Sequence, residues 1–156
     1  KNGKHEKGTN LIRQLVYSNF ITTIEISPVG NSVTPQNLLN ASNGQGTNAN
    51  VYFNPKYNPE ILTQNPETSK ISFTKRPDFI GLGHELIHAI NISKGEENFK
   101  PIEYSYTDEK GEVQIENTRS NELRVVGIAG NKSGDITEND LRKEHNSTKN
   151  KVRIKY

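Results

Sequence analysis

The amino-acid sequence predicts an α+β protein, in which a small and mostly antiparallel sheet packs on helices. Three stretches carry this prediction. Residues 21–27 (ITTIEIS) are rich in β-branched side chains and alternate in polarity, as a half-buried strand does. Residues 102–116 have the pattern of a β-hairpin that turns at 109–111. Residues 77–95 carry apolar side chains at helical spacing between a proline and a glycine, which favour the beginning and the end of a helix.

The N-terminal half of the chain contains shorter signals. Residues 10–18 carry leucines at helical spacing, with Asn10 as the predicted N-cap. The Gly- and Asn-rich residues 40–50 predict a loop or turn. Residues 51–54 (VYFN) predict a short strand that Pro55 ends. Because a proline beside a strand favours an edge position, we expect this strand at the edge of the sheet.

The C-terminal half predicts two further helices and a strand. Residues 118–129 and 137–145 are predicted to be helical. Thr137 heads the second of these helices, and Asp140 three residues later makes an imperfect capping box. Residues 149–156 alternate basic and apolar side chains, as a strand does.

Length and composition predict one domain over residues 1–156 with a modest core, because only 30% of the residues are hydrophobic. Without Cys, neither disulfides nor thiolate ligands can stabilise the fold. A net charge of +2 and the lack of an apolar run of roughly 20 residues argue against nucleic-acid and membrane binding. The first ten residues lack the apolar segment of a signal peptide. Because Met is absent, we expect a piece trimmed from a longer protein, with residues 1–9 flexible.

The strongest functional signal is the sequence GHELIHAI, within the predicted helix 77–95. His84 and His88 lie four residues apart, so both imidazoles face one side of a helix and can share a single Zn²⁺. Glu85 flanks that face, where it can reach a water on the metal without being a ligand. The mostly apolar neighbours predict a buried active-site helix and argue against a helix with two surface histidines.

A catalytic zinc site needs a third protein ligand and an open position for water. The metzincin extension of the motif is excluded, because Asn91 and Lys94 stand where it requires a glycine and a third histidine. His145 is the only later histidine, and its charged surroundings (RKEHNST) predict a solvated side chain. The third ligand is therefore expected to be a carboxylate.

Glu122 is the predicted third ligand. On a helix it shares one face with three apolar residues, while Arg124 points away; the three are Val125, Val126 and Ala129. A carboxylate within an apolar stripe needs a partner that neutralises it, and a metal ion is such a partner. The alternative is a glutamate at the rim of the stripe that pairs with a lysine or arginine. Glu116 and Glu138 are second choices, because both lie among polar neighbours.

The motif HELIHA, followed by the helical Glu122, resembles the Glu-zincin metallopeptidases. Together with SNELRVVGI and TENDLRKE, residues 76–144 resemble the NleD- and HopH-like family of bacterial effector zinc metallopeptidases. This resemblance implies a minimal zincin-like fold and a secreted zinc endopeptidase that a pathogen delivers into host cells, where it acts on host signalling proteins. It also implies His84, His88 and Glu122 as zinc ligands and Glu85 as the base.

The HELIHA core is also distantly similar to the clostridial neurotoxin light chains, which carry an Arg-x-x-Tyr pair that stabilises the transition state. Arg153 and Tyr156 have this spacing, and the resemblance implies them as catalytic residues. In a strand, however, residues three apart face opposite sides, so that the apolar residues of the tail would pack and the basic ones would be solvated. Tyr104 and Tyr106 of the predicted hairpin are competing phenol donors.

We therefore predict a zinc-dependent endopeptidase that hydrolyses peptide bonds in protein or peptide substrates, bound extended along the 51–54 edge strand. A non-catalytic, zinc-stabilised binding domain of a larger toxin is the alternative, but a structural zinc site needs no base such as Glu85. A nucleic-acid-binding module would depend on the basic residues of 149–156. That patch is short and has no base-stacking aromatic residue besides Tyr156, so it predicts a solvated tail.

Overall fold

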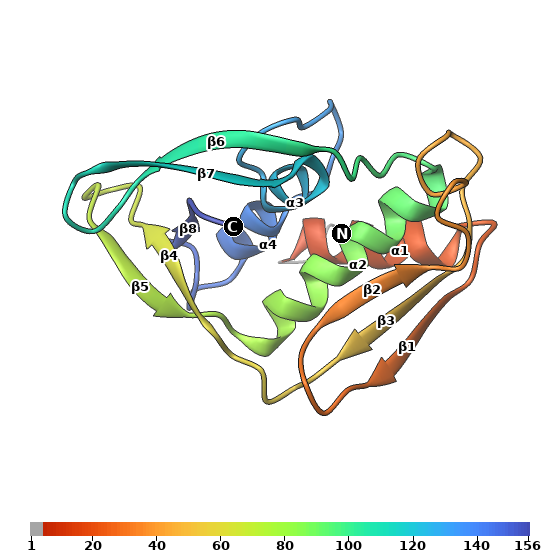
Figure 1. Cartoon of the computed structure of the whole chain (residues 1–156). Coiled ribbons are helices and arrows are strands. Elements are labelled where there is room, and N and C mark those ends of the chain that lie inside the picture. Colours follow the sequence, from red (N-terminus) through yellow and green to blue (C-terminus); the bar gives the residue numbers. More distant parts are fainter. Residues whose placement is uncertain (1–4) are drawn as a thin grey trace.

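The computed structural model describes residues 5–156, in which short strands and three smaller helices surround one long helix (Figure 1). The helices are α1 (Glu6–Val16), α2 (Asp78–Lys94), α3 (Ser120–Val126) and α4 (Glu138–Glu144). The strands are β1 (Thr22–Ile26), β2 (Ser32–Pro35), β3 (Ala49–Phe53), β4 (Glu60–Gln64), β5 (Ile71–Lys75), β6 (Pro101–Thr107), β7 (Val113–Arg119) and β8 (Val152–Arg153). None of the helices in the described residues is long and apolar enough to cross a membrane.

Helix α2 forms as the sequence predicts and is the centre of the structure. Pro77 precedes its first residue, and Gly95 ends it in the left-handed conformation (φ 69°) that glycine adopts without steric cost. Apart from Leu82, every residue from Ile80 to Ile92 is buried. A helix that is buried all round lies in the interior of a protein, so packing from every direction holds the HELIH motif in place.

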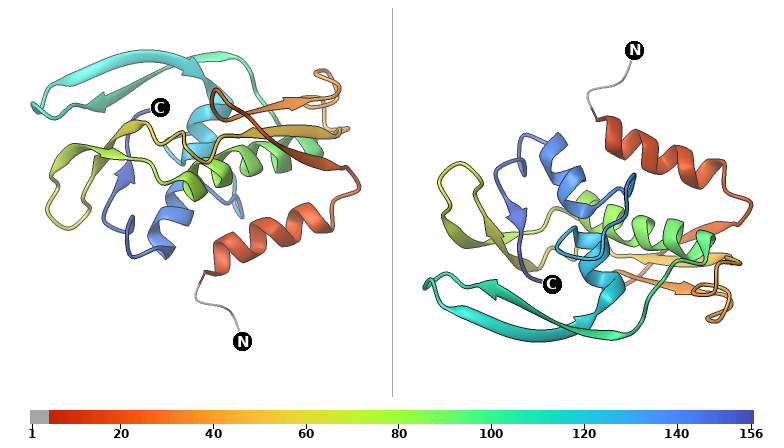
Figure 2. Two further views of the ribbon diagram at one scale, coloured as in Figure 1. Left: turned by 90° about the horizontal axis from the view of Figure 1, so that it is seen from below. Right: turned by 90° about the horizontal axis from the view of Figure 1, so that it is seen from above.

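Two layers enclose α2 (Figure 2). The sheet β1-β3-β2 covers one side, with Ala49 and Val51 of β3 in the shared core. Helices α1 and α4 pack on the other side through Leu11 and Leu141. Helix α4 approaches closely because position 83 is a glycine: a Cβ on Gly83 would stand 2.5 Å from the Leu141 side chain. The main hydrophobic core is therefore built around α2.

The predicted edge position of residues 51–54 is wrong, because β3 is the middle strand of its sheet. It pairs in parallel with β1 and antiparallel with β2. Strand β3 ends at Phe53, so Pro55 lies beyond the ladder and its missing N–H group removes no hydrogen bond. The proline that marks an edge is Pro35, the last residue of β2.

The remaining strands form a second sheet, β5-β4-β8, and the two-stranded hairpin β6-β7. The hairpin confirms the prediction for residues 102–116. Strands β2, β4 and β5 were not predicted, since each has only four or five residues and several polar side chains. The strand expected at 149–156 is reduced to the two residues of β8. The class is α+β with mostly antiparallel pairing, but three small sheets replace the expected one.

Helix α1 begins four residues earlier than predicted, because its N-terminus is capped from another part of the chain. The Glu144 carboxylate of α4 accepts hydrogen bonds from the backbone N–H groups of Lys7 and Gly8. These are donors that the first turn of a helix leaves without an intrahelical partner. Residues 6–9 are therefore helical where a flexible segment was expected, and His5 is the N-cap residue. Residues 1–4 of that expectation lie outside the described residues.

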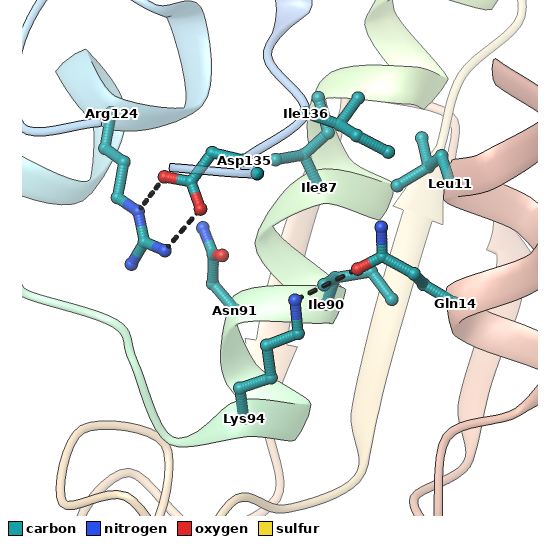
Figure 3. Close-up of a pocket in the computed structure, with 10 residues that line it drawn as sticks. Leu11, Gln14, Ile87, Ile90, Asn91, Lys94, Arg124, Asp135 and Ile136 are labelled. Atoms are coloured by element: carbon teal, nitrogen blue, oxygen red, sulfur yellow. Dashed lines mark hydrogen bonds and ion pairs between the residues drawn. The ribbon is translucent and has the colours of Figure 1, made fainter. Parts of the chain in front are cut away.

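Helices α3 and α4 lie where the sequence predicts them, with α3 ending before Gly127. The capping box of α4 is complete: Thr137 Oγ1 accepts from the Asp140 N–H at 3.1 Å, and Asp140 Oδ2 accepts from the Thr137 N–H at 3.1 Å. Arg124 of α3 points away from Glu122 as predicted but is buried, because Asp135 binds its guanidinium at 2.8 and 2.9 Å (Figure 3). This ion pair connects the loop before α4 to helix α3.

We expect Gly95→Ala to destabilise the protein more than Gly111→Ala does. Both residues have positive φ (69° and 84°), which costs an L-residue about 1–2 kcal/mol. A Cβ on Gly95 would also stand 2.6 Å from the Gly44 backbone nitrogen, whereas a Cβ on Gly111 would meet nothing within 4 Å. Urea unfolding should give Gly95→Ala an additional loss of about 1–3 kcal/mol, and equal losses would contradict this packing.

Candidate metal centre

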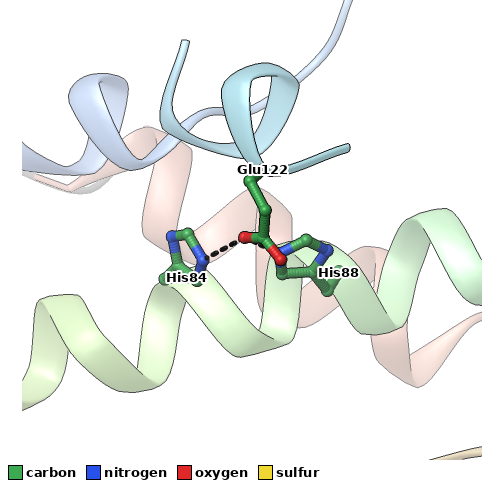
Figure 4. A group of neighbouring side chains, drawn as sticks. All are labelled: His84, His88 and Glu122. Carbon is green, nitrogen blue, oxygen red and sulfur yellow. Dashed lines mark hydrogen bonds and ion pairs between the residues drawn. The ribbon is translucent and has the colours of Figure 1, made fainter. Parts of the chain in front are cut away.

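His84 and His88 lie one turn apart on α2 and converge with Glu122 of α3 (Figure 4). The Nε2 atoms of His84 and His88 stand 3.3 and 3.0 Å from the same oxygen of Glu122, Oε2. One ligand atom from each of the three residues lies within 4.8 Å of the other two. Helix α3 is short and follows directly on β7, so the hairpin and α3 together bring Glu122 over the face of α2.

Two further carboxylates each bind the Nδ1 atom of one imidazole. His84 Nδ1 lies 2.9 Å from Glu138 Oε2, and His88 Nδ1 lies 3.0 Å from Glu97 Oε1. An ionised carboxylate can only accept, so each Nδ1 carries the proton and donates it. In the neutral imidazole, which is the form that binds a metal ion, Nε2 is the nitrogen without a proton, and it faces the centre of the cluster. Metal-binding histidines typically have such an outer carboxylate, which sets the tautomer and the ring orientation.

The sequence interpretation of Glu138 is wrong. We expected it among polar neighbours as a second-choice ligand, but its side chain is fully buried. Besides His84, it accepts hydrogen bonds from Arg142 Nε at 2.9 Å and from Arg153 Nη1 at 2.8 Å. The i,i+4 spacing of Glu138 and Arg142 on α4 is visible in the sequence, whereas the contact with His84 depends on how α4 packs on α2. Glu97 was missed altogether, and Asn121 donates to its second oxygen.

The carboxylates around the two imidazoles favour positive charge at the centre of this cluster. Burial disfavours the charged form of His88, but hydrogen bonds to Glu122 and Glu97 outweigh burial and raise its pKa to about 10. Burial alone would raise the pKa of Glu122, yet hydrogen bonds from His84 and His88 lower it well below the usual range. Two imidazole nitrogens and a carboxylate oxygen are a donor set that Zn²⁺ binds, with a fourth position left open. The residues present therefore fit a zinc ion.

Glu85 lies beside the cluster in a cleft between α2, β2 and α3 with a volume of about 200 Å³. Burial raises the pKa of the Glu85 carboxyl, while His84 and His88 act in the opposite direction. Among the described residues, no hydrogen bond or ion pair involves its carboxylate. A raised pKa and free oxygens suit a group that exchanges a proton with a bound water.

Tyr156 lines this cleft and Arg153 lies directly behind it, although a regular strand would direct the two side chains to opposite sides. Strand β8 ends at Arg153, and the chain then turns so that the Tyr156 ring stacks on His84 with 6.0 Å between centroids. The Arg153 guanidinium lies 5.0 Å from the Tyr156 ring centre and is buried, so its predicted solvation is wrong. Burial and the negative charge of Glu122 raise the pKa of Tyr156, which therefore keeps its proton at neutral pH.

The other candidates lie elsewhere. Tyr106 donates to Glu116 at 2.8 Å on the face of the hairpin, and neither it nor Tyr104 lines the cleft. Tyr104 instead accepts the Tyr156 N–H at 3.2 Å and so helps to place the C-terminal residue. His145 is half-buried against His5, with ring centroids 4.3 Å apart, and is not part of the cluster.

Comparisons with known proteins identify a matching family and solved structures with a similar fold. A family model described as "Peptidase_M91: Effector protein" matches residues 2–153. The zinc-free crystal structure of the botulinum neurotoxin type C light chain aligns with a TM-score of 0.52 and 14% identity, over 78% of this chain and 40% of that chain. The botulinum neurotoxin serotype C1 light chain protease aligns with a TM-score of 0.51 and 14% identity, over 77% of this chain and 40% of that chain. No curated protein sequence matches the chain.

The likeness to the neurotoxin light chains is one of fold, because the identity is low, and it confirms the predicted α+β, zincin-like architecture. The chain spans less than half the length of these solved relatives.

We expect Glu138→Gln to lower the free energy of unfolding by about 3–5 kcal/mol, because it leaves Arg142 and Arg153 buried without their shared anion. Lys143→Gln is the control on the same helix. Its ammonium lies 3.9 Å from Asp140 and is largely exposed, so the loss should stay below about 1 kcal/mol. Chemical denaturation at neutral pH measures both values, and similar losses would contradict a central role for Glu138.

Proposed function

The chain belongs to the M91 peptidase family of effector proteins, and we propose that it is a zinc-dependent endopeptidase that cleaves proteins of a host cell. One observation carries the proposal: two imidazoles and a carboxylate converge, each imidazole is held by an outer carboxylate, and Glu85 lies free beside them. We propose residues 1–156 as a single peptidase domain. Secretion and delivery into the host are further parts of the proposal, supported by the effector family alone.

His84, His88 and Glu122 are the proposed zinc ligands. Bound there, Zn²⁺ would lower the pKa of a coordinated water towards 7 and polarise the scissile carbonyl. Glu138 and Glu97 keep both Nε2 lone pairs directed at the metal position. This support from buried residues favours an ordered site that the protein holds ready for metal.

Glu85 is the proposed general base. It takes a proton from water as the water oxygen bonds to the carbonyl carbon of the substrate. It then passes this proton to the amide nitrogen as the C–N bond breaks, so that one amine and one carboxylic acid are formed. Burial raises the pKa of Glu85, which makes its carboxylate a stronger base for the first step.

Tyr156 and Arg153 are the proposed groups that stabilise the oxyanion. Tyr156 keeps its proton, stacks on His84 and lines the cleft, so its hydroxyl can donate to the developing negative charge. One such donor is typically worth about 2.7–4 kcal/mol of transition-state stabilisation. Arg153 contacts the ring of Tyr156 and the carboxylate of Glu138, and so adds positive charge and positions the tyrosine.

The substrate is proposed to lie along β2, in place of the strand that the sequence suggested. Gln36 donates to the Asn48 carbonyl at 2.9 Å, and this fixes which residues of β2 bond to β3. By the alternation of an antiparallel ladder, Val33 and Pro35 direct their backbone groups to the free edge. Val33 offers both N–H and C=O there, and both residues line the cleft. An extended peptide can therefore add to this edge.

A zinc-stabilised binding domain without catalysis is the second candidate function. It would account for the ligands and their outer carboxylates equally well. It leaves Glu85 without a role, since burying a carboxylate that no residue neutralises is unfavourable.

We expect Glu85→Gln to lower kcat/KM roughly 10²- to 10⁴-fold, as for other general bases, with one zinc still bound per chain. Cleavage of an unstructured protein, measured with and without a metal chelator, and zinc content by mass spectrometry test this expectation. Glu103→Gln, which changes an exposed carboxylate of β6, is the control and should cleave like the wild type. Unchanged cleavage by Glu85→Gln would contradict the mechanism, and a zinc-loaded wild type without cleavage would favour the binding domain.

We expect Tyr156→Phe to lower kcat roughly 10²-fold with little effect on KM, because the donated hydrogen bond forms only in the transition state. Tyr106→Phe removes a hydroxyl that binds Glu116 outside the cleft, and should leave both constants unchanged. Steady-state kinetics on one peptide compares the two variants. The reverse order of effects would assign the oxyanion donor to the hairpin.

A further inference from the structure

Asn121 lines the cleft and directly precedes the proposed ligand Glu122 on α3. Its side chain is buried, and its Nδ2 group donates a hydrogen bond to Oε2 of Glu97. Because an ionised carboxylate can only accept, the atom of Asn121 that faces Glu97 must be the amide nitrogen, which determines the orientation of the amide. The Asn121 side chain therefore binds the oxygen of Glu97 that does not contact His88.

Both oxygens of Glu97 accept hydrogen bonds as a result. Oε1 lies 3.0 Å from Nδ1 of His88, and Oε2 accepts from the Asn121 amide. The Glu97 side chain is buried, so water contributes little to its orientation. It belongs to the connection between α2 and β6, outside any helix or strand. Its position opposite His88 therefore depends on these two hydrogen bonds.

The side chains form a closed ring that includes His88. Glu97 binds Nδ1 of His88, Asn121 binds Glu97, and Oε2 of Glu122 lies 3.0 Å from Nε2 of His88. Asn121 and Glu122 are consecutive residues of one short helix. Helix α3 thus supplies one proposed zinc ligand and also holds the outer carboxylate of another.

The position of α3 itself does not depend on the Asn121 amide. The backbone N–H of Asn121 donates to the Asn98 carbonyl at 2.9 Å. The Arg124 guanidinium donates to the carbonyl of Glu96 at 3.1 Å and to its carboxylate at 2.7 Å. These contacts join α3 to the segment after α2 and remain when the side chain at position 121 changes. Loss of the amide therefore acts mainly on Glu97.

The second half of the amide gains nothing from its position. Oδ1 of Asn121 is buried and accepts no hydrogen bond from residues 5–156. A buried carbonyl oxygen without a donor is unfavourable, and an apolar side chain of similar size would avoid this cost. The favourable contribution of the amide is therefore its hydrogen bond to Glu97.

We propose that Asn121 is a positioning residue of the metal centre, which holds Glu97 against His88 and thereby strengthens zinc binding. The inference rests on the proposed zinc site and extends it by one residue that acts through another. Without the amide donor, the Glu97 carboxylate can rotate away from Nδ1 of His88. The imidazole must then be ordered when the metal ion binds, and this lowers the affinity.

The zinc affinity of Asn121→Leu, measured by competition with a chromogenic chelator, tests this role. We expect the Kd to rise roughly 10-fold, the lower end of the range for residues that support metal ligands. Urea unfolding of the zinc-free chain should give a midpoint close to that of the wild type, because the other contacts of α3 remain. Asn117→Leu, the same substitution at an exposed position of β7, should keep the wild-type Kd. An unchanged Kd in Asn121→Leu overturns the inference.

A double-mutant cycle assigns the effect to Glu97. Glu97→Leu alone should raise the Kd roughly 10- to 100-fold. Adding Asn121→Leu should then change it by less than about twofold, because Asn121 acts through Glu97, and a second rise of about 10-fold would overturn this route.

Two further outcomes are decisive. If Asn121→Leu does not fold, Asn121→Ser, whose side chain is too short for this hydrogen bond, takes its place, and an unchanged Kd again overturns the inference. A wild-type chain that binds no zinc would refute the metal centre and the peptidase function, and the inference with them. A wild type that binds zinc and cleaves, beside a variant of unchanged affinity, refutes the inference alone.

Discussion

The rest of the site depends on the buried carboxylate of Glu138. It is fully buried on α4, and it binds His84 of α2, Arg142 of its own helix and Arg153 of the C-terminal segment. One side chain therefore sets the orientation of an imidazole and holds the end of the chain against α2. Because an isolated buried charge is so unfavourable, the two guanidinium groups and the imidazole around it have little freedom to rearrange.

This arrangement explains how a chain with a small hydrophobic fraction can hold a rigid site. The sheets are short, and the apolar core is confined to the surroundings of α2. Polar contacts of high sequence separation supply the remaining order: Glu144 caps α1, Asp135 binds Arg124, and Asn139 exchanges two hydrogen bonds with the backbone of Arg153. Such contacts are directional, so they specify one arrangement of helices more strictly than apolar packing alone would.

Several errors of sequence interpretation have one physical origin. Glu138 was expected among polar neighbours, and Arg153 was expected to be a solvated residue of an alternating strand. Each is buried by a partner that lies far away in the sequence or across a loop. The same holds for the start of α1, which Glu144 caps from a distance, and for β3, whose place in the sheet depends on β2, a strand too short and polar to predict. Local patterns describe a residue's own element and say little about what packs against it.

The sequence by itself determined the features that one element encodes: the α+β class, the long helix with His84, Glu85 and His88 on it, the hairpin, and the capping box at Thr137. The placement of the two histidines on one face is independent of the rest of the chain, because residues four apart on a helix always share a face. Glu122 could be named as well, because a carboxylate in an apolar stripe needs a partner. Only the tertiary structure decided which imidazoles Glu122 contacts and which carboxylates bind their other nitrogens. It also decided that the Arg76 side chain is buried with no hydrogen-bond partner among residues 5–156. These contacts depend on the path of the chain between elements, and no local spacing records that path.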